Sequence, residues 1–192
     1  MNDFFLVNND TYINQYGQEI RQFLVKELES WASIAEPIRI ALKRNYSDKS
    51  IEAAICANKF KAIAMCSFAT DVTALKIDEM IQNDADRFIE LFKDVINVNK
   101  AFFDQEGAKK SELNKTEKDK TTWFDSFQTL ISKGHKHQDI LNYSFGAFLE
   151  YLKAAQRYEC NSILSQSTTM RVAYHADKKG FSGYTKAVGK EE

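Results

Sequence analysis

The most constraining feature of this sequence is how few residues it has that break a helix. Pro37 is the only proline among 192 residues, and Gly17 is the only glycine before residue 107. A β-sandwich or β-barrel of this length needs many turns that contain glycine or proline. The sequence therefore predicts an all-α fold. Hydrophobic residues make up 44% of the chain, so wholesale disorder is also excluded.

Two properties of the chain change together near residue 107. Residues 1–106 carry 12 basic and 17 acidic side chains, whereas residues 107–192 carry 14 basic and 10 acidic ones. Six of the seven glycines also lie after residue 106. The coincidence of these two shifts predicts that the chain has two differently built halves.

The boundary between the halves is a polar segment. Residues 107–122 contain one large apolar residue, Leu113, and such a stretch buries too little surface to offset the entropy of ordering. We expect a helical N-terminal domain over 1–106, a flexible charged linker over 107–122, and a small helical C-terminal module with a flexible tail over 123–192. A solvated helix carrying charge pairs is the alternative for the linker.

Helical periodicity dominates the first half. Asp10 is expected to cap a first helix that has Ile13 and Ile20 on its apolar face. Pro37 suits the first turn of a second helix, where its missing N–H costs nothing. Two further helices are expected. Ser47 or Ser50 begins the third, which runs through Ile51, Ala62 and Ala69, and Asp84 begins the fourth, which runs from Phe88 to Phe102.

The second half contains stronger helix boundaries. Thr122 and Asp125 resemble a capping box for a helix over 123–133, with Gly134 as its left-handed C-cap. Ser144 is expected to open another helix, with Phe145 and Phe148 facing inward. The spacing of Met170, Ala173 and Tyr174 predicts a separate last helix. A tail broken at Gly180, Gly183 and Gly189 is expected to follow it.

The chain offers little for catalysis. His135 and His137 lie beside Asp139, and His175 lies near Asp177, but residues two apart on a helix point to different sides. No nucleophile motif or phosphate-binding glycine loop is present. We therefore expect no enzyme, no bound metal and no cofactor; a metal site on the histidines stays a minor alternative.

Net charge and cysteine content limit which partners and which cellular compartment are expected. The net charge of -1 gives no global attraction to nucleic acid or to an acidic membrane. A small basic patch near Phe181 and Tyr184 keeps nucleic acid as an unlikely alternative. No signal peptide and no apolar run of about 18 residues is present. Three cysteines without a Cys-x-x-Cys pair (Cys56, Cys66 and Cys160) predict reduced core residues in a reducing compartment.

A family resemblance lies in the second half of the chain. It rests on Trp123–His135, an aromatic helix that ends in Gly-His, on Asp139-Ile140-Leu141-Asn142-Tyr143, and on the basic stretch Met170–Lys179. These segments, mainly within residues 123–188, resemble the C-terminal region of tail assembly chaperones of long-tailed bacteriophages. Members of that family are often extended through a linker, which fits the predicted organisation.

The resemblance implies a function without catalytic residues. It implies a chaperone that binds the tape-measure protein in the bacterial host cytoplasm and keeps it soluble before the tail tube polymerises. Masking the apolar stripe of such a helical client needs exposed apolar surface. A structural virion component, such as a minor tail or adaptor protein, is the alternative function, and a second copy of the chain is a further candidate partner. The expected partner-binding residues are aromatic side chains of the second half: Trp123, Phe127, Tyr143, Phe145 and Phe148.

Overall fold

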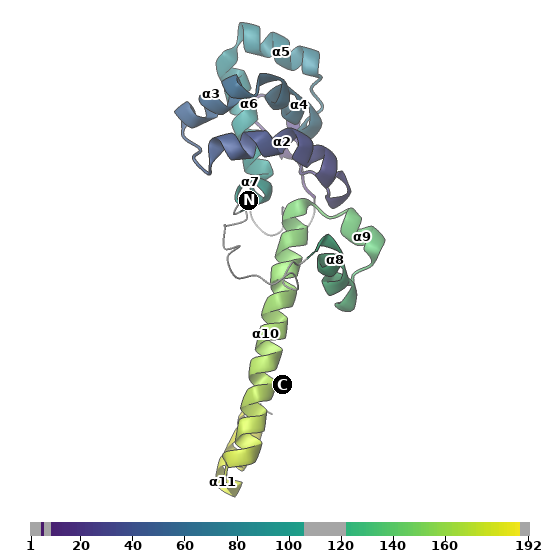
Figure 1. Ribbon diagram of the computed structural model, residues 1–192, viewed down its shortest axis with the longest axis vertical. Helices are drawn as coiled ribbons and strands as arrows, with labels where there is room; N and C mark the ends of the chain where they lie inside the picture. Colours follow the sequence, from purple (N-terminus) through teal and green to yellow (C-terminus); the bar gives the residue numbers. More distant parts are fainter. Residues whose placement is uncertain (1–4, 6–8, 106–121, 189–192) are drawn as a thin grey trace. The chain divides into compact units, whose positions relative to one another are not determined.

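The computed structural model describes residue 5, residues 9–105 and residues 122–188. The predicted linker, except Thr122, lies outside these residues, as does the expected break at Gly189. The fold is all-α, as the shortage of helix breakers predicted (Figure 1). In chain order the elements are β1 (Tyr12–Ile13), β2 (Glu19–Ile20), the 3-10 helix η1 (Val25–Glu27), α2 (Leu28–Leu42), α3 (Asp48–Ala57), α4 (Lys59–Ala69), α5 (Ala74–Asn83), α6 (Ala85–Val98), α7 (Lys100–Phe103), α8 (Trp123–Ser132), α9 (His137–Leu141), α10 (Phe145–His175) and α11 (Lys178–Val188).

The chain divides into two compact units, residues 1–151 and residues 152–192. This division does not coincide with the expected one at 107–122, because the first part of the expected C-terminal module packs on the N-terminal helices. The Phe145 ring stacks on Phe23, with centroids 5.1 Å apart. Unit 1 therefore includes α8, α9 and the start of α10, and unit 2 comprises the rest of α10 and α11.

The expected first helix is instead a short antiparallel hairpin, in which Ile13 pairs with Glu19. The Asn14 side chain accepts hydrogen bonds from the backbone N–H groups of Tyr16 and Gln18. Gly17 takes a positive φ of 73° at the turn. Both features compete with a helix, since asparagine and glycine satisfy turn geometry locally.

Pro37 lies inside α2 rather than in a first turn. Proline has no N–H, so the carbonyl oxygen four residues earlier loses its helical partner. That oxygen, on Ser33, accepts a hydrogen bond from Lys61 Nζ at 3.4 Å. A side chain from α4 thus replaces the missing backbone donor, and α2 continues past the proline.

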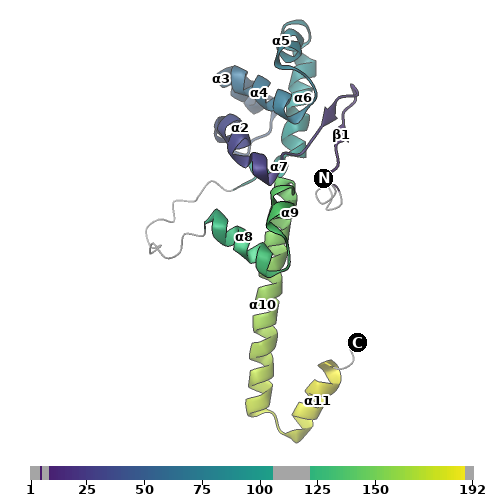
Figure 2. The ribbon, with the colours of Figure 1, turned by 90° about the vertical axis from the view of Figure 1, so that its right-hand side faces the viewer.

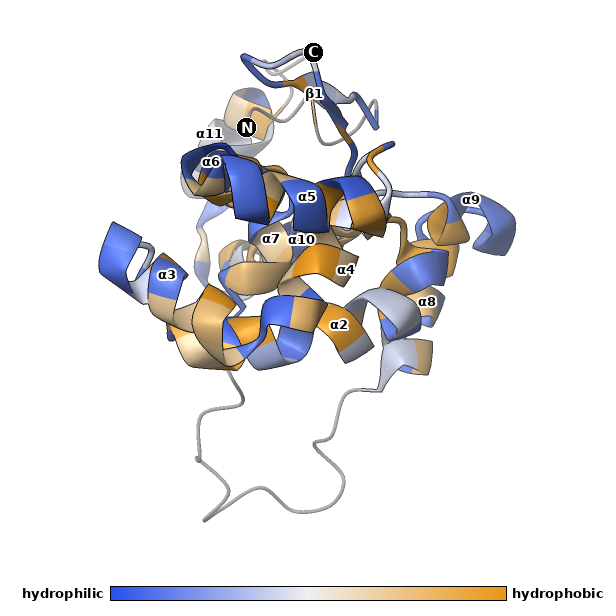
Figure 3. Ribbon diagram, turned by 90° about the horizontal axis from the view of Figure 1, so that it is seen from above, coloured by the Kyte–Doolittle hydropathy of each residue, from blue (hydrophilic) through white to orange (hydrophobic). Residues whose placement is uncertain are grey.

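The expected third helix is broken at Asn58 into α3 and α4. Asn58 has a non-helical φ of -136°, and its side-chain amide donates to the carbonyl of Ala54. The break lets the largely apolar α4 lie between α2 and α6 (Figure 3). Asp84 begins α6 as predicted, because its carboxylate accepts from the Arg87 N–H at 3.2 Å, while Phe102 falls in α7.

The core of unit 1 is aromatic and is centred on Trp31. Its ring stacks on Phe23 at 4.8 Å and contacts Phe102 edge-on at 6.2 Å. Such offset and edge-on pairs add to the stability from burial. The largest fully buried side chains are Trp31, Phe23, Phe88, Phe92, Phe103, Phe145, Phe148, Ile20, Ile38, Leu42, Met65 and Ile77.

The capping box and the Gly134 C-cap of α8 are confirmed. Thr122 and Asp125 exchange hydrogen bonds between side chain and backbone at 2.7 and 3.2 Å, and Gly134 has a φ of 96°. Ser144 opens α10 by accepting from the Ala147 N–H at 3.1 Å. The pattern over residues 145–175 predicted two helices, but α10 is continuous.

Unit 2 contains α11 where a broken tail was expected. The Asp177 carboxylate accepts from the Gly180 N–H at 2.7 Å and so caps the start of the helix. The Tyr184 hydroxyl hydrogen-bonds to Thr169 Oγ1 at 2.7 Å, which ties α11 to α10 (Figure 2). These two contacts offset the low helix propensity of Gly180 and Gly183.

Candidate functional site

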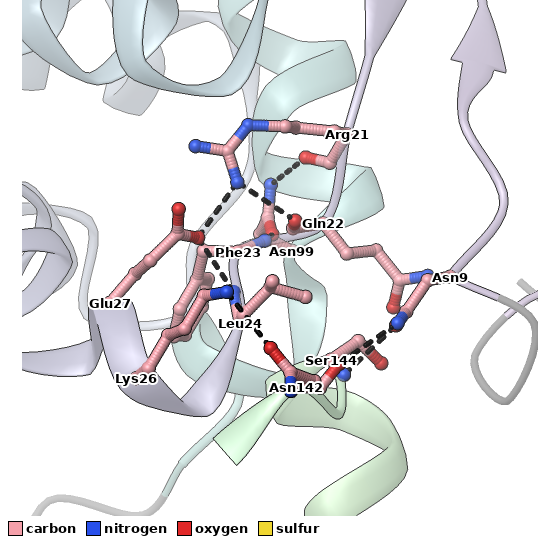
Figure 4. A network of polar contacts seen from close by, with 10 residues as sticks. All are labelled: Asn9, Arg21, Gln22, Phe23, Leu24, Lys26, Glu27, Asn99, Asn142 and Ser144. Carbon is pink, nitrogen blue, oxygen red and sulfur yellow. Dashed lines mark hydrogen bonds and ion pairs between the residues drawn. The ribbon is translucent and has the colours of Figure 1, made fainter. Parts of the chain in front are cut away.

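A joint between two distant segments holds the start of α10 on the N-terminal helices (Figure 4). The Val25 N–H donates to the Tyr143 carbonyl at 2.9 Å, and the Phe145 N–H donates to the Phe23 carbonyl at 3.1 Å. Asn9 adds two hydrogen bonds, to Asn142 O and from the N–H of Ser144. The joint fixes where α10 begins within unit 1.

Four of the five predicted contact residues form one aromatic cluster. The Trp123 ring lies 5.9 Å from Phe148 and 6.3 Å from Phe145, and the Phe127 ring lies 5.7 Å from Phe148. Within this cluster Phe145 and Phe148 are buried, and they belong to the core of unit 1. Their rings pack α8 against α10, and neither ring is at the surface of unit 1.

The surface part of the cluster lies on α8. The Trp123 side chain is 51% exposed and Phe127 is half-buried. Sequence reasoning missed Phe124, which is 69% exposed and directly follows Trp123, and Ile131 is also at the surface. Only Leu130 of α8 is fully buried, so one side of this short helix presents aromatic and aliphatic groups outward.

Tyr143 belongs to a second aromatic group rather than to this cluster. Its hydroxyl lies 2.8 Å from His135 Nδ1, and its ring lies 5.1 Å from Tyr151. Partial burial raises the pKa of the Tyr143 hydroxyl, and the neighbouring Tyr151 and Asp139 raise it further. A half-buried tyrosine bonded to a histidine stabilises the turn before α10.

The three histidines do not come together as a metal site. His135 is engaged by Tyr143, the His137 ring lies 5.5 Å from Phe127, and His175 ends α10 in unit 2. Among the described residues, no group of three or more histidine, cysteine, aspartate or glutamate side chains is placed to hold a metal ion.

The cysteines differ from the expectation of three buried residues. Cys66 is fully buried in α4, and this burial raises the pKa of its thiol. Cys56 and Cys160 are exposed free cysteines on α3 and α10. The helical pattern predicted their secondary structure, but their burial depends on which helices pack against them.

Unit 2 has a row of apolar side chains along α10 that are largely exposed, and sequence reasoning did not single it out. Leu152 (half-buried), Ile163, Met170 and Tyr174 are spaced 11, 7 and 4 residues apart, which places all four on one side of α10. We call these four residues the apolar row. Further exposed apolar side chains of unit 2 are Tyr158, Leu164, Phe181 and Val188.

An open groove lies at the C-terminal end of the apolar row. It is lined by Met170, Arg171, Tyr174 and His175, which we call the α10 groove. Tyr174 is 88% exposed and Met170 is 66% exposed. The groove thus combines an aromatic ring and a thioether with a guanidinium and an imidazole.

Comparison with protein-family models, with curated proteins and with solved structures finds no match. None of the helices in the described residues combines the length and the apolar character that crossing a membrane requires. The function must therefore be argued from the two apolar surfaces described above.

Proposed function

We propose that this chain is a non-enzymatic assembly factor that binds an apolar helical client through the apolar row of α10. The observation that carries the proposal is the exposure of Ile163, Met170 and Tyr174 along one side of a long helix. Large apolar side chains repeated along an exposed helix mark protein-binding surfaces. In line with the sequence resemblance, we propose that the client is the tape-measure protein of a long-tailed bacteriophage.

The spacing of the row suits pairing with another helix. Separations of 4, 7 and 11 residues correspond to one, two and three turns, so the row follows the seam along which helices interlock. Gln156, Glu159 and Gln166 lie on the same side between the apolar residues. Polar residues in such a seam lower the stability of the pair, which favours transient binding over a permanent complex.

The exposed side of α8 provides a second candidate contact. Trp123 and Phe127, which the sequence singled out, lie there together with Phe124. Phe145 and Phe148 support this surface from inside unit 1. We propose that α8 contributes additional apolar area to client binding, while the buried pair Phe145 and Phe148 fixes the position of α8.

This division of roles fits a chaperone that acts in the host cytoplasm before the tail tube polymerises. A client helix held on an exposed row is shielded from aggregation, and it leaves when its own apolar stripe finds a permanent partner. A weak seam allows that release, since most differences in affinity between related complexes arise from the dissociation rate.

Co-expression tests the proposal. The full chain is produced with the tape-measure protein encoded by the same genome, and the soluble, co-purifying fraction of that protein is measured. We expect co-purification with the unmodified chain and its loss with the double variant Ile163→Asp and Met170→Asp. The control is Phe60→Asp with Leu75→Asp, which places the same changes at exposed apolar positions of unit 1.

Two outcomes contradict the proposal. The first is that the tape-measure protein neither co-purifies nor becomes more soluble. The second is that both double variants reduce binding equally, which would place the contact elsewhere. Mass spectrometry of purified particles then separates the roles, because a chaperone is absent from them and a structural virion component is present.

A further inference from the structure

The charged side chains in the segment that carries the α10 groove are almost all positive. Residues 160–190 contain one acidic residue, Asp177, whose carboxylate accepts a hydrogen bond from Gly180. Within the described part of the chain, the basic side chains of this segment have no ion-pair partner. They are Arg171, Lys178, Lys179 and Lys186.

Positive and apolar groups alternate along the same helix. Met170 and Tyr174 are one turn apart, and Arg171 and His175 form the adjacent row, also one turn apart. A helix that lies on the apolar row therefore has the Arg171 guanidinium along its flank. In paired helices, the residues flanking the apolar seam select the partner by charge.

From this geometry we infer that the α10 groove binds an acidic amphipathic helix, one with glutamate or aspartate beside its apolar stripe. The inference rests on the proposed function and names the chemistry of the client. Carboxylates beside the apolar stripe of the client can pair with Arg171, which has no ion-pair partner among the described residues. Tyr174 supplies apolar contact area. Complementary charge raises both the association rate and the selectivity for such a partner.

The same surface disfavours a second copy of this chain. A two-fold symmetric contact through the groove sets the same patch on both subunits. Arg171 of one copy then approaches Arg171 of the other, and like charges across an interface are costly. Single-stranded nucleic acid is disfavoured because the row is mainly aliphatic, whereas base binding relies on stacked aromatic rings.

Two synthetic peptides test the inference with the full chain. Both have the same four-heptad apolar stripe of leucine and isoleucine; one has glutamate at every flanking position, and the other has lysine. Binding of each labelled peptide is measured by fluorescence anisotropy at about 0.05 M and about 0.5 M salt. We expect the glutamate peptide to bind at least about tenfold more tightly at low salt, and this ratio to shrink at high salt, where charges are screened.

Variants locate the effect. Arg171→Glu is expected to reduce the preference for the glutamate peptide by at least about fivefold, and Tyr174→Ser to weaken the binding of both peptides. Lys49→Glu makes the same change in charge at an exposed lysine of unit 1 and is expected to leave the preference unchanged. Circular dichroism of each variant confirms that the helices are intact.

The results separate this inference from the proposed function. Equal binding of the two peptides, or an equal effect of Arg171→Glu and Lys49→Glu, overturns the charge preference while helix binding stands. Failure to bind either peptide contradicts both. The inference is also overturned if a single-stranded oligonucleotide displaces the glutamate peptide, or if sedimentation shows a dimer that Tyr174→Ser converts to a monomer.

Discussion

At the scale of single residues, Asn99 attaches the segment that leads into η1 to the end of α6. Its carbonyl oxygen accepts from the Phe23 N–H at 3.0 Å, and its amide donates to the carbonyls of Arg21 and Val95. The side chain is 4% exposed, so water cannot replace these partners. Sequence reasoning did not find Asn99, since its partner Phe23 is 76 residues away in the chain.

Asn99→Ala is expected to lower the free energy of unfolding by about 1–3 kcal/mol, because buried backbone groups lose their partner. Chemical denaturation measures the change. Asn97→Ala is the control, since Asn97 is exposed in the last turn of α6, two residues before Asn99, and we expect a change within about 0.5 kcal/mol. Equal effects of the two variants would show that the hydrogen bonds of Asn99 do not stabilise this attachment.

Glu27 provides a pH-dependent test of the same segment. Its partial burial opposes ionisation, but hydrogen bonds from Arg21 and from the Leu24 N–H outweigh it and lower the pKa of this carboxyl below its usual value. The ion pair therefore stabilises the fold at neutral pH. That contribution decreases as the pH falls below about 4.5, where the unfolded chain takes up the proton first.

Glu27→Gln is expected to destabilise the protein by about 1 kcal/mol at pH 7, because the pair is partly exposed. The difference from the unmodified protein should shrink progressively as the pH falls below about 4.5. Thermal unfolding across this range measures it, with Glu52→Gln on the exposed side of α3 as the control. A difference that stays constant with pH would contradict the role of the Glu27 charge.

At the scale of elements, local signals were predictable and distant packing was not. The capping box at Thr122 and Asp125, the start of α6 at Asp84 and the Gly134 C-cap each depend on a few neighbouring residues, and all three were predicted. The position of Pro37 inside α2 was not, and the carbonyl that loses its backbone donor there is contacted by Lys61 of another helix. Burial of Phe145 likewise depends on Phe23, far away in the sequence.

Phe148 tests whether the aromatic cluster is core or contact surface. Phe148→Ala is expected to cost about 3–5 kcal/mol of stability, as is usual for a buried phenylalanine, whereas Phe124→Ala should cost little because Phe124 is 69% exposed. Denaturant unfolding of both variants measures the difference. A small loss for Phe148→Ala would indicate that it is available to a partner, as the sequence resemblance implied.

At the scale of the whole molecule, the charge shift and the glycine shift near residue 107 divide the chain by composition. They did not locate the division between the compact units, which falls at Tyr151 and Leu152. Composition reports which residues are present, whereas the division depends on which residues the start of α10 packs against. The apolar row was missed because the low overall periodicity of α10 conceals its spacing.

The central claim is that the apolar row of α10 binds a helical client. Amide hydrogen exchange of the full chain, free and co-purified with the tape-measure protein of the same genome, tests it most directly. Residues 158–175 have few tertiary contacts in the free protein and should exchange quickly. We predict that exchange there slows at least about tenfold with the client, while α2 is unchanged. Unchanged exchange in residues 158–175 of the complex would contradict the claim.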